Sequence, residues 1–569
     1  MVNKMKHISF DEANDASWKE IAIKSLRGMP FEKLITKTAE GIEINPLYTK
    51  ESLEKTLHDT LDEMTKTIRH TKTTSTWTIA QQNHSQTSEA FIEELQDALE
   101  RGNEAVVYDG TRKIDWSTES LTALAEMIVN YPVYALDIDE DDSFLGVFEL
   151  VELSKRKSVK GAVTATNYTL PDGYEQIRTI ALDVRDIHHD GADIITELAV
   201  ILAKAAEKAG DYKDFKTFEE DVLVRISIDT EFFLEISKIR AFRVLWQTFA
   251  EAYGHEAYSW VPVYSENSLR TYSKLDEYVN LLRAGNEALA AAIGGTDILT
   301  IHPHDILTGS NPLTARFARN VQLVIKEETY VDEVIDPSGG SYFIETLTNE
   351  FIERAWAYFV EIEAQGGYSA FVEKGLLAKK VTHVREERRN LVAHNKKSLI
   401  GTNVYADLDR PAAEETNPLN VENRLAEPYE KLREYFLGNQ PKVVLLTFGE
   451  LKDFKPRTDF VSGFLATGGL NVVHSPAFES VEAGRAWIND NEFDYGIICV
   501  SPKETEAVLN ELITDFPPNK WIDVAGKYEG EEADAWKLAG VSDFIYKGQN
   551  QIEKINEIKQ SWEEVLGNE

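Results

Sequence analysis

The chain has 569 residues, and 43% of them are hydrophobic, which is enough for several domains with large buried cores. Its 60 basic and 97 acidic residues give a formal net charge of -37, so its field repels phosphate backbones and anionic membranes. The composition predicts a soluble globular protein and argues against nucleic acids and membranes as partners.

Two further features indicate the compartment. The single cysteine, Cys499, cannot form an intrachain disulfide, and residues 1–15 contain no apolar signal-peptide core. No apolar run approaches the roughly 20 residues that a membrane helix needs. We therefore expect a protein of the reducing cytoplasm.

Residues 1–60 are predicted to form an N-terminal helical arm. The arm contains one irregular stretch, AEGIEINPLYTKESL at 39–53, and few of its apolar positions repeat at a helical or strand period. Such a segment cannot bury itself as a separate domain, so we expect it to pack on another surface.

Residues 61–396 carry the pattern of a barrel. Short β-rich runs mostly alternate with amphipathic helical stretches, such as SLTALAEMIVNY at 120–131. Eight runs begin at Trp77, Glu104, Pro132, Lys160, Thr179, Val222, Ala257 and Asp297. Strands that alternate with helices pair in parallel, so the pattern predicts a (β/α)8 TIM barrel with a helical extension. The connection after the fourth run, residues 169–178, shows no helical period and is the exception.

Polar residues gather at the C-terminal ends of these runs. They are Asn83, Asp109, Asp137, His189, Asp229, Glu266 and His304. In barrel enzymes this face carries the active site. Strand ends also meet solvent in any barrel, and solvation is the interpretation that we favour for these side chains.

Residues 397–437 are predicted to be a linker, because they contain prolines, are polar and acidic, and lack either period. Beyond them, residues 438–569 contain further strand-like runs, each followed by a helical or loop segment. Five runs begin at Lys442, Leu470, Asp494, Lys520 and Val541. This order is typical of a flavodoxin-like doubly wound α/β domain.

Four stretches carry a resemblance to a known family. The longest is residues 311–367, and the others are EISKIRAFRVLW at 235–246, YVNLLRAGNEALAAAIGGTDIL at 278–299 and EGIEINPLYT at 40–49. They resemble the methylmalonyl-CoA mutase family, and the domain order extends the resemblance over essentially the whole chain. The resemblance implies a barrel that holds an acyl-CoA and a C-terminal domain of the cobalamin-binding type. In that family, adenosylcobalamin drives the radical interconversion of methylmalonyl-CoA and succinyl-CoA.

The family's cobalt ligand is missing from this chain. In the family, a DxHxxG motif supplies the histidine that ligates cobalt, and an ungapped match places Leu451, Asp453 and Pro456 at its Asp, His and Gly. A carboxylate is a poor replacement for a neutral imidazole, and proline stiffens a loop that needs glycine. The histidine of this domain, His474, lies one strand later.

The family elements that seat the nucleotide tail of the cofactor are also degraded. Where the family has SxL, Ser501 is followed by Pro502 and Lys503, and Ala525-Gly526 stands for a glycine pair. Together with the lost histidine, these changes imply that residues 438–569 form a degenerate cobalamin-binding domain, which binds no cofactor.

The barrel departs from the family's catalytic chains in the same way. Their TWTIRQYAGFS reads TWTIAQQNHSQ here, with Ala80 for the arginine and Gln82 for the tyrosine that faces the substrate. Their RTHCQTSG resembles the region around PVYSENSL, where Tyr264 and Glu266 stand for the histidine and the glutamine.

The stretch DVRDIHHDGAD at 183–193 contains two adjacent histidines, which could be a metal site, a proton-transfer pair or the remnant of one. Catalytic chains carry GYHMQEAGA, and an ungapped match places Arg185 and Asp186 at its Tyr-His pair. A two-residue gap would restore His188, with Ile187 for the tyrosine. Either alignment breaks the pair. Imidazoles ahead of a helix can also cap a strand end, and a metal site needs further ligands that the sequence does not supply.

The resemblance therefore implies the small (beta), non-catalytic subunit of a heterodimeric methylmalonyl-CoA mutase, an isomerase of propionate metabolism. We expect no catalytic, cofactor-binding or metal-binding residues in this chain. Adenosylcobalamin and the acyl-CoA substrate are expected on a homologous large subunit, which this chain would stabilise through its N-terminal arm. Two alternatives stay open: a stand-alone structural or binding protein on a degenerate mutase scaffold, and a catalytic acyl-CoA mutase of altered specificity, which would still need the cobalt ligand.

Overall fold

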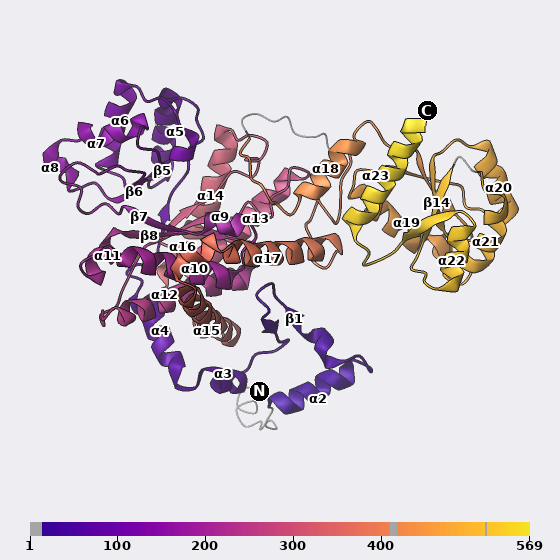
Figure 1. Cartoon of the computed structure of the whole chain (residues 1–569), viewed down its shortest axis with the longest axis horizontal. Helices are drawn as coiled ribbons and strands as arrows, with labels where there is room; N and C mark the ends of the chain where they lie inside the picture. Colours follow the sequence, from indigo (N-terminus) through magenta and orange to yellow (C-terminus); the bar gives the residue numbers. More distant parts are fainter. Residues whose placement is uncertain (1–13, 410–417, 518–519, 569) are drawn as a thin grey trace, which may run out of the picture. The chain divides into compact units, whose positions relative to one another are not determined.

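The computed structural model describes residues 14–409, 418–517 and 520–568 (Figure 1). The chain divides into two compact units. The first comprises Met1–Ser268, Leu282–Pro303 and Ser310–Arg385, and the second comprises Leu269–Leu281, His304–Gly309 and Glu386–Glu569. The division differs from the predicted boundary at residue 396. The longest segment of the second unit starts at Glu386, and the unit also includes two short segments that follow strands of the first.

The first unit is a barrel-like arrangement of parallel strands. Among the described residues these strands are β3 (Thr78–Ile79), β4 (Val106–Asp109), β5 (Val133–Ile138), β6 (Gly161–Ala165), β7 (Ile180–Asp183), β8 (Val222–Ile228), β9 (Val263–Asn267) and β10 (Ile298–Thr300). They form two sheets, in the orders β3-β10-β9-β8-β7 and β4-β5-β6. A parallel bridge from Ala162 to Arg178 joins the sheets at one side, and the Glu104 N–H donates to the Ile79 carbonyl at the other, over 2.9 Å. The predicted strand positions are therefore confirmed.

Helices follow most of these strands. They include α5 (Ser88–Glu100), α6 (Thr118–Ile128), α10 (Ile194–Ala209), α12 (Phe232–Ala252), α13 (Glu277–Gly294), α14 (Pro312–Thr329), α15 (Tyr342–Ala364), α16 (Gly367–Glu373) and α17 (Leu376–Ala393), with shorter helices α7 (Val147–Leu150), α8 (Leu153–Arg156), α9 (Arg185–His189) and α11 (Phe215–Asp221). The chain between Ala165 and Ile180, fully described, contains no helix, as the sequence predicts. No helix in the described part of the chain has the length and apolar character needed to cross a membrane.

Helix α12, which holds the stretch 235–246, is fixed by buried ion pairs. The Arg240 side chain is fully buried; its Nε donates to Asp336 over 2.8 Å and its Nη2 to Glu345 over 2.9 Å. Glu345 lies on α15, which packs against α12 (Figure 1). The buried charges of α12 therefore join it to the segment that follows the barrel strands.

The N-terminal arm has two parts that differ in burial. Helix α3 (Lys50–Leu57), at the end of the arm, buries Leu53 and Leu57 in a cluster with Met64 and Ile68 of the following helix α4 (Leu61–His70) and with Val244 of α12. Helix α2 (Asp15–Ser25), in contrast, buries none of its residues. The first part of the arm thus has no core of its own within the described chain.

The second unit contains a parallel sheet in the order β12-β11-β13-β14-β15. Its strands are β11 (Val443–Thr447), β12 (Val472–His474), β13 (Tyr495–Cys499), β14 (Trp521–Ala525) and β15 (Val541–Ile545), and its helices include α18 (Glu427–Phe436), α19 (Leu451–Ala466), α20 (Val481–Asp490), α21 (Thr505–Leu512), α22 (Glu531–Leu538) and α23 (Gln551–Asn568). This is the 2-1-3-4-5 order of flavodoxin-like sheets, and the predicted strand positions are confirmed.

The predicted linker contains a helix. Tyr429, Leu432 and Phe436 of α18 are buried. These residues recur at the i, i+3, i+7 spacing of an apolar helix face, so the period is present within the polar segment. Polar composition hid it, because acidic and basic residues fill the other face.

Candidate functional site at the mouth of the barrel

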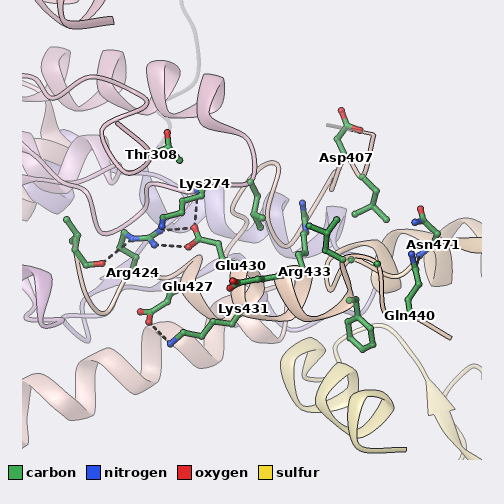
Figure 2. Close-up of a pocket in the computed structure, with 18 of the residues that line it drawn as sticks. Lys274, Thr308, Asp407, Arg424, Glu427, Glu430, Lys431, Arg433, Gln440 and Asn471 are labelled. Atoms are coloured by element: carbon green, nitrogen blue, oxygen red, sulfur yellow. Dashed lines mark hydrogen bonds and ion pairs between the residues drawn. The ribbon is translucent and has the colours of Figure 1, made fainter. Parts of the chain in front are cut away.

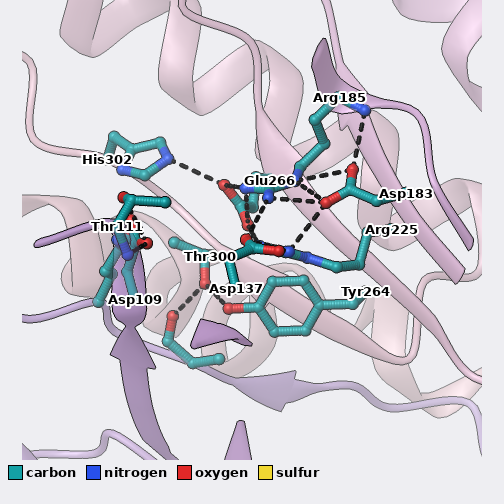
Figure 3. A network of polar contacts seen from close by, with 12 residues as sticks. Asp109, Thr111, Asp137, Asp183, Arg185, Arg225, Tyr264, Glu266, Thr300 and His302 are labelled. Atoms are coloured by element: carbon teal, nitrogen blue, oxygen red, sulfur yellow. Dashed lines mark hydrogen bonds and ion pairs between the residues drawn. The ribbon is translucent and has the colours of Figure 1, made fainter. Parts of the chain in front are cut away.

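Charged side chains converge at the C-terminal ends of the barrel strands (Figure 3). The strand register places Asp183 of β7 beside Arg225 of β8, and Arg225 beside Tyr264 of β9. Asp137 of β5 and Glu266 of β9 complete the group. Asp183, Arg225 and Tyr264 share one layer, because parallel strands in register project neighbouring side chains to the same level.

Arg225 joins three carboxylates. Its Nη1 lies 2.6 Å from Asp137 Oδ2 and 2.8 Å from Asp183 Oδ2, and its Nη2 lies 3.3 Å from Glu266 Oε1. Its side chain is only 3% exposed. Arg225 stands inside a strand that is buried throughout, so these pairs balance a charge that would otherwise be costly.

Arg185, at the start of α9, contacts the same three carboxylates. Its Nη1 donates to both oxygens of Glu266, over 2.8 and 2.9 Å, and its Nη2 donates to Asp183 over 2.8 Å and to Asp137 over 3.2 Å. Figure 3 shows the carboxylates gathered around the two guanidinium groups. The five side chains Asp137, Asp183, Arg185, Arg225 and Glu266 are called the mouth network below.

The network holds the carboxylates of Asp183 and Glu266 in the charged form. Burial raises the pKa of Asp183, but Arg225 and Arg185 outweigh it and lower that pKa to about 2. Burial also opposes ionisation of Glu266, yet Arg185 chiefly holds its pKa well below the usual range. Every charge in the network therefore has an internal partner at neutral pH.

Asp137 reaches the network from an unusual backbone conformation. Its φ of 58° lies in the left-handed region, and the register of β5 against β6 shifts between Ala135 and Ile138. A Cβ on Gly110 would lie 2.5 Å from the Asp137 carbonyl oxygen, so only glycine fits beneath this bulge. Such a conformation costs about 1–3 kcal/mol, which the ion pairs of Asp137 offset.

The positions matched to the family's substrate-facing residues lie beside the network. Tyr264 is buried, and its hydroxyl is 2.7 Å from Thr300 Oγ1, which donates to the Ala80 carbonyl. Gln82 donates to Asp109 Oδ2 over 2.8 Å. The structure thus brings Ala80, Gln82, Tyr264 and Glu266 to one end of the barrel, as the sequence match requires.

Two histidines border the network. The Arg112 guanidinium lies 2.8 Å from His84 Nδ1, and His302 Nε2 lies 3.3 Å from Glu266 Oε2. Burial holds the pKa of His84 well below its ordinary value, so this imidazole is neutral. His84 and His302 therefore contact charged side chains of the barrel mouth, Arg112 and Glu266, and the two imidazoles do not form an exposed acid–base pair.

His188 does not join the mouth network. It is fully buried, with Nδ1 2.7 Å from Glu197 and Nε2 2.7 Å from Ser268 Oγ. Glu197 also lies 3.1 Å from Lys238. Ser268, His188 and Glu197 have the order of a Ser-His-acid triad, but all three side chains are buried and none is open to a substrate. Of the stretch 183–193, it is Asp183 and Arg185 that line the mouth.

The expected solvation of the strand ends is wrong for three of the polar residues. Asp229, Glu266 and His304 are 1%, 7% and 4% exposed. At these positions the side chains are buried rather than solvated. Arg225 and Asp183 were not among the site residues predicted from the sequence. The available signal was the arginine in the middle of the apolar run VLVRISI, because such a charge needs a buried partner.

A further buried acid, Glu287, lies outside the mouth network. Glu287 of α13 is fully buried, and its Oε2 accepts from Asn267 over 3.3 Å. Burial, and then the charge of Asp229, raise the pKa of Glu287 well above its ordinary value of 4.5. The carboxyl group is therefore protonated where exposed glutamates are charged.

This shift predicts a pH-dependent stability. Because folding raises the pKa, the contribution of Glu287 is complete below pH 4.5 and is lost as the pH rises toward the raised value. Glu287→Gln, which mimics the protonated form, should match the wild type near about pH 5 and exceed its unfolding temperature by about 2 °C or more near pH 8. Thermal unfolding followed by circular dichroism measures this, with the exposed Glu93→Gln as control. Equal midpoints at both pH values would show that Glu287 is charged.

In the second unit, the residues matched to the DxHxxG motif lie in a helix. Helix α19 begins at Leu451, and the Asp453 carboxylate accepts from the Glu450 N–H over 3.2 Å in a capping box. Pro456 lies inside the helix. The motif positions therefore form helix rather than the loop that the sequence match suggested, since the capping box starts the helix before them.

Side chains also fill the space near the end of β14. Arg457 of α19 donates to Thr505 Oγ1 over 3.1 Å and to the Tyr528 hydroxyl over 2.9 Å. A Cβ on Gly526 would lie 2.8 Å from the Tyr528 ring and 3.0 Å from Arg457 Nη2. Ser501 donates to Glu504 over 2.9 Å. These residues thus contact one another where the sequence match places the nucleotide tail.

Comparison with known proteins agrees with this geometry. The family model described as Methylmalonyl-CoA mutase matches residues 150–444. A Porphyromonas gingivalis protein named methylmalonyl-CoA mutase small subunit is 27% identical over 96% of this chain and 97% of its own length. A probable methylmalonyl-CoA mutase small subunit of Mycobacterium tuberculosis is 33% identical over 60% of this chain and 58% of its own, and the small subunit of Streptomyces virginiae is 27% identical over 78% and 76%. The chain belongs to the methylmalonyl-CoA mutase family, and its relatives include several proteins named small subunits.

Proposed function

We propose that the chain is the non-catalytic small subunit of a heterodimeric, adenosylcobalamin-dependent methylmalonyl-CoA mutase. In this role it stabilises a homologous large subunit, which carries the cofactor and the acyl-CoA. The barrel of this chain is a TIM barrel retained as a scaffold, and its C-terminal domain is a degenerate cobalamin-binding domain.

The mouth network is the observation that carries this proposal. A substrate that bound at these side chains would have to displace Arg185 and Arg225 from three carboxylates, each already paired over 2.6–3.3 Å. Breaking buried pairs of this kind costs several kcal/mol. The residues matched to the catalytic tyrosine and histidine, Gln82 and Asp186, also lack the side chains that the family's catalytic chains use. Both facts favour a barrel that holds its own charges over one that binds a substrate.

The second unit supports the same proposal. Adenosylcobalamin needs an imidazole for cobalt and space for its nucleotide tail, and Asp453 and the Arg457–Tyr528 contact supply neither. The residues present therefore do not fit the cofactor. We assign the radical chemistry to the partner chain.

Co-expression tests the proposal. A tagged copy of this chain should capture a larger homologue that contains DxHxxG, and mutase turnover should require that homologue. The matched control is the large homologue expressed alone, which should give less soluble protein and less activity. If this chain purifies as a homodimer and never retains the large homologue, it is instead a stand-alone protein on a mutase scaffold.

A further inference from the structure

The second unit contains a cavity of about 560 Å³ that the proposed function does not use (Figure 2). Helix α18 forms one wall, with Arg433 and Phe436 among the lining residues. Leu275, Val421 and Leu437 add apolar surface, and Gln440 and Asn471 add amide groups. The cavity therefore combines a cation with apolar walls, which is typical of sites for small organic ligands.

The other basic groups of α18 and its neighbourhood are already paired. Arg424 donates to both oxygens of Glu430, each over 2.7 Å, and Lys431 Nζ lies 2.6 Å from Glu427. Figure 2 marks both contacts with dashed lines. These four side chains neutralise one another, so they leave no charge for a ligand.

Arg433 differs from them, because it contacts only main-chain oxygens. Its Nε donates to the Thr467 carbonyl, and its Nη2 donates to the carbonyls of Gly401 and Thr402, each over 3.1 Å. Among the described residues Arg433 makes no ion pair, although the charges of Asp407, Glu430 and Asp276 act on it from a longer distance. The two hydrogens on Nη1 are left over from these bonds. A partly buried guanidinium with no carboxylate in direct contact would be stabilised by an anion bound to its remaining hydrogens.

The backbone packs closely around Arg433. A Cβ on Gly469 would lie 2.9 Å from Arg433 Cα, so glycine at that position makes room for the arginine. Burial lowers the pKa of Arg433 to about 10, which leaves the group charged at neutral pH. A fixed, charged donor needs little reorganisation when a ligand arrives.

We propose that this cavity binds a small organic carboxylate, with its anionic end on Arg433 Nη1 and its apolar body against Leu275, Val421 and Leu437. Arg433 makes no ion pair with a described residue, and its Nη1 offers one place for a single negative charge. Asp407 and Glu434 also line the cavity, and their charge disfavours a dianion such as a phosphate monoester. All the lining residues belong to the second unit, and none is in the mouth network.

Calorimetry on the purified full chain tests the site with three probes: hexanoate, its neutral analogue hexanamide, and hexyl phosphate. Hexanoate should bind in a one-to-one ratio. Hexanamide and hexyl phosphate should each bind about tenfold more weakly or worse, since the first lacks the charge-assisted hydrogen bond and the second carries two charges. The proposal would be overturned if hexanoate did not bind, if hexanamide bound as tightly as hexanoate, or if hexyl phosphate bound more tightly than hexanoate.

Variants locate the site. Arg433→Met should weaken hexanoate binding about tenfold or more, whereas Lys431→Met, which removes a paired cation of the same cavity, should leave it within about twofold. Because Arg433 also bonds three carbonyls, Arg433→Met can unfold the domain. Leu437→Glu avoids this, since Leu437 is 74% exposed, and its added charge should exclude hexanoate. Unchanged binding in Leu437→Glu, or in a folded Arg433→Met, would contradict the proposed site.

Discussion

Arg225→Met is expected to destabilise the barrel by about 3–5 kcal/mol, the usual cost of removing one partner from a buried ion-pair network. The change would leave Asp137, Asp183 and Glu266 with Arg185 as their shared cation. Methionine keeps much of the side-chain volume, so the loss reports on charge more than on packing. Urea unfolding followed by circular dichroism measures the effect.

The matched control is Arg101→Met, which removes an arginine whose pair with Asp97 lies on the surface, with a side chain 55% exposed. We expect that change to cost less than about 0.5 kcal/mol, since exposed pairs contribute little. Arg225→Lys should fall between the two, because an ammonium keeps the charge but cannot bridge three carboxylates in the same way. Equal stability of Arg225→Met and Arg101→Met would mean that the network does not hold the barrel together.

Deleting residues 1–30 is expected to weaken assembly with the large subunit about tenfold or more while leaving the barrel folded. Helix α2 buries none of its own residues, and Ile21, Ile23 and Met29 are 64%, 46% and 51% exposed. The cut spares Ile42, which is buried, and the helices α3 and α4, which pack on α12 and α15. The unfolding temperature of the truncated chain alone should therefore stay close to that of the full chain.

Sedimentation of the mixed subunits measures this assembly. Leu538→Ser is a suitable control, because Leu538 is an apolar residue 91% exposed in the second unit and outside the arm. We expect that variant to assemble like the full chain. If the truncated chain assembles as tightly as the full one, the arm is not the interface.

The sequence predicted the parts of the fold that depend on local patterns. Strands such as VLVRISI and DYGIICV lie where their apolar runs place them, because burial on both faces of a parallel strand leaves a continuous signal. The absence of a helix between β6 and β7 was also predicted from the sequence, since residues 169–178 have no helical period. Helix α18 was missed, because its apolar face is only Tyr429, Leu432 and Phe436 among charged neighbours.

The mouth network could not be predicted in the same way. Arg225 pairs with Asp137, 88 residues away, and Arg185 pairs with Glu266, 81 residues away, so the partners are set by barrel closure and not by neighbours in the chain. The family match placed Arg185, Tyr264 and Glu266 at one end of the barrel but gave no contacts. It also suggested a loop at Leu451, where the Glu450–Asp453 capping box forms a helix.

If this chain supports a mutase without binding adenosylcobalamin, the corrinoid content of the purified complex should be that of the large subunit alone. The complex of this chain with its large homologue, loaded with adenosylcobalamin and passed through gel filtration, should retain one corrinoid per pair of chains at full mutase turnover. This chain alone, treated in the same way, should retain none. Two corrinoids per pair, or stoichiometric corrinoid on this chain alone, would contradict the account.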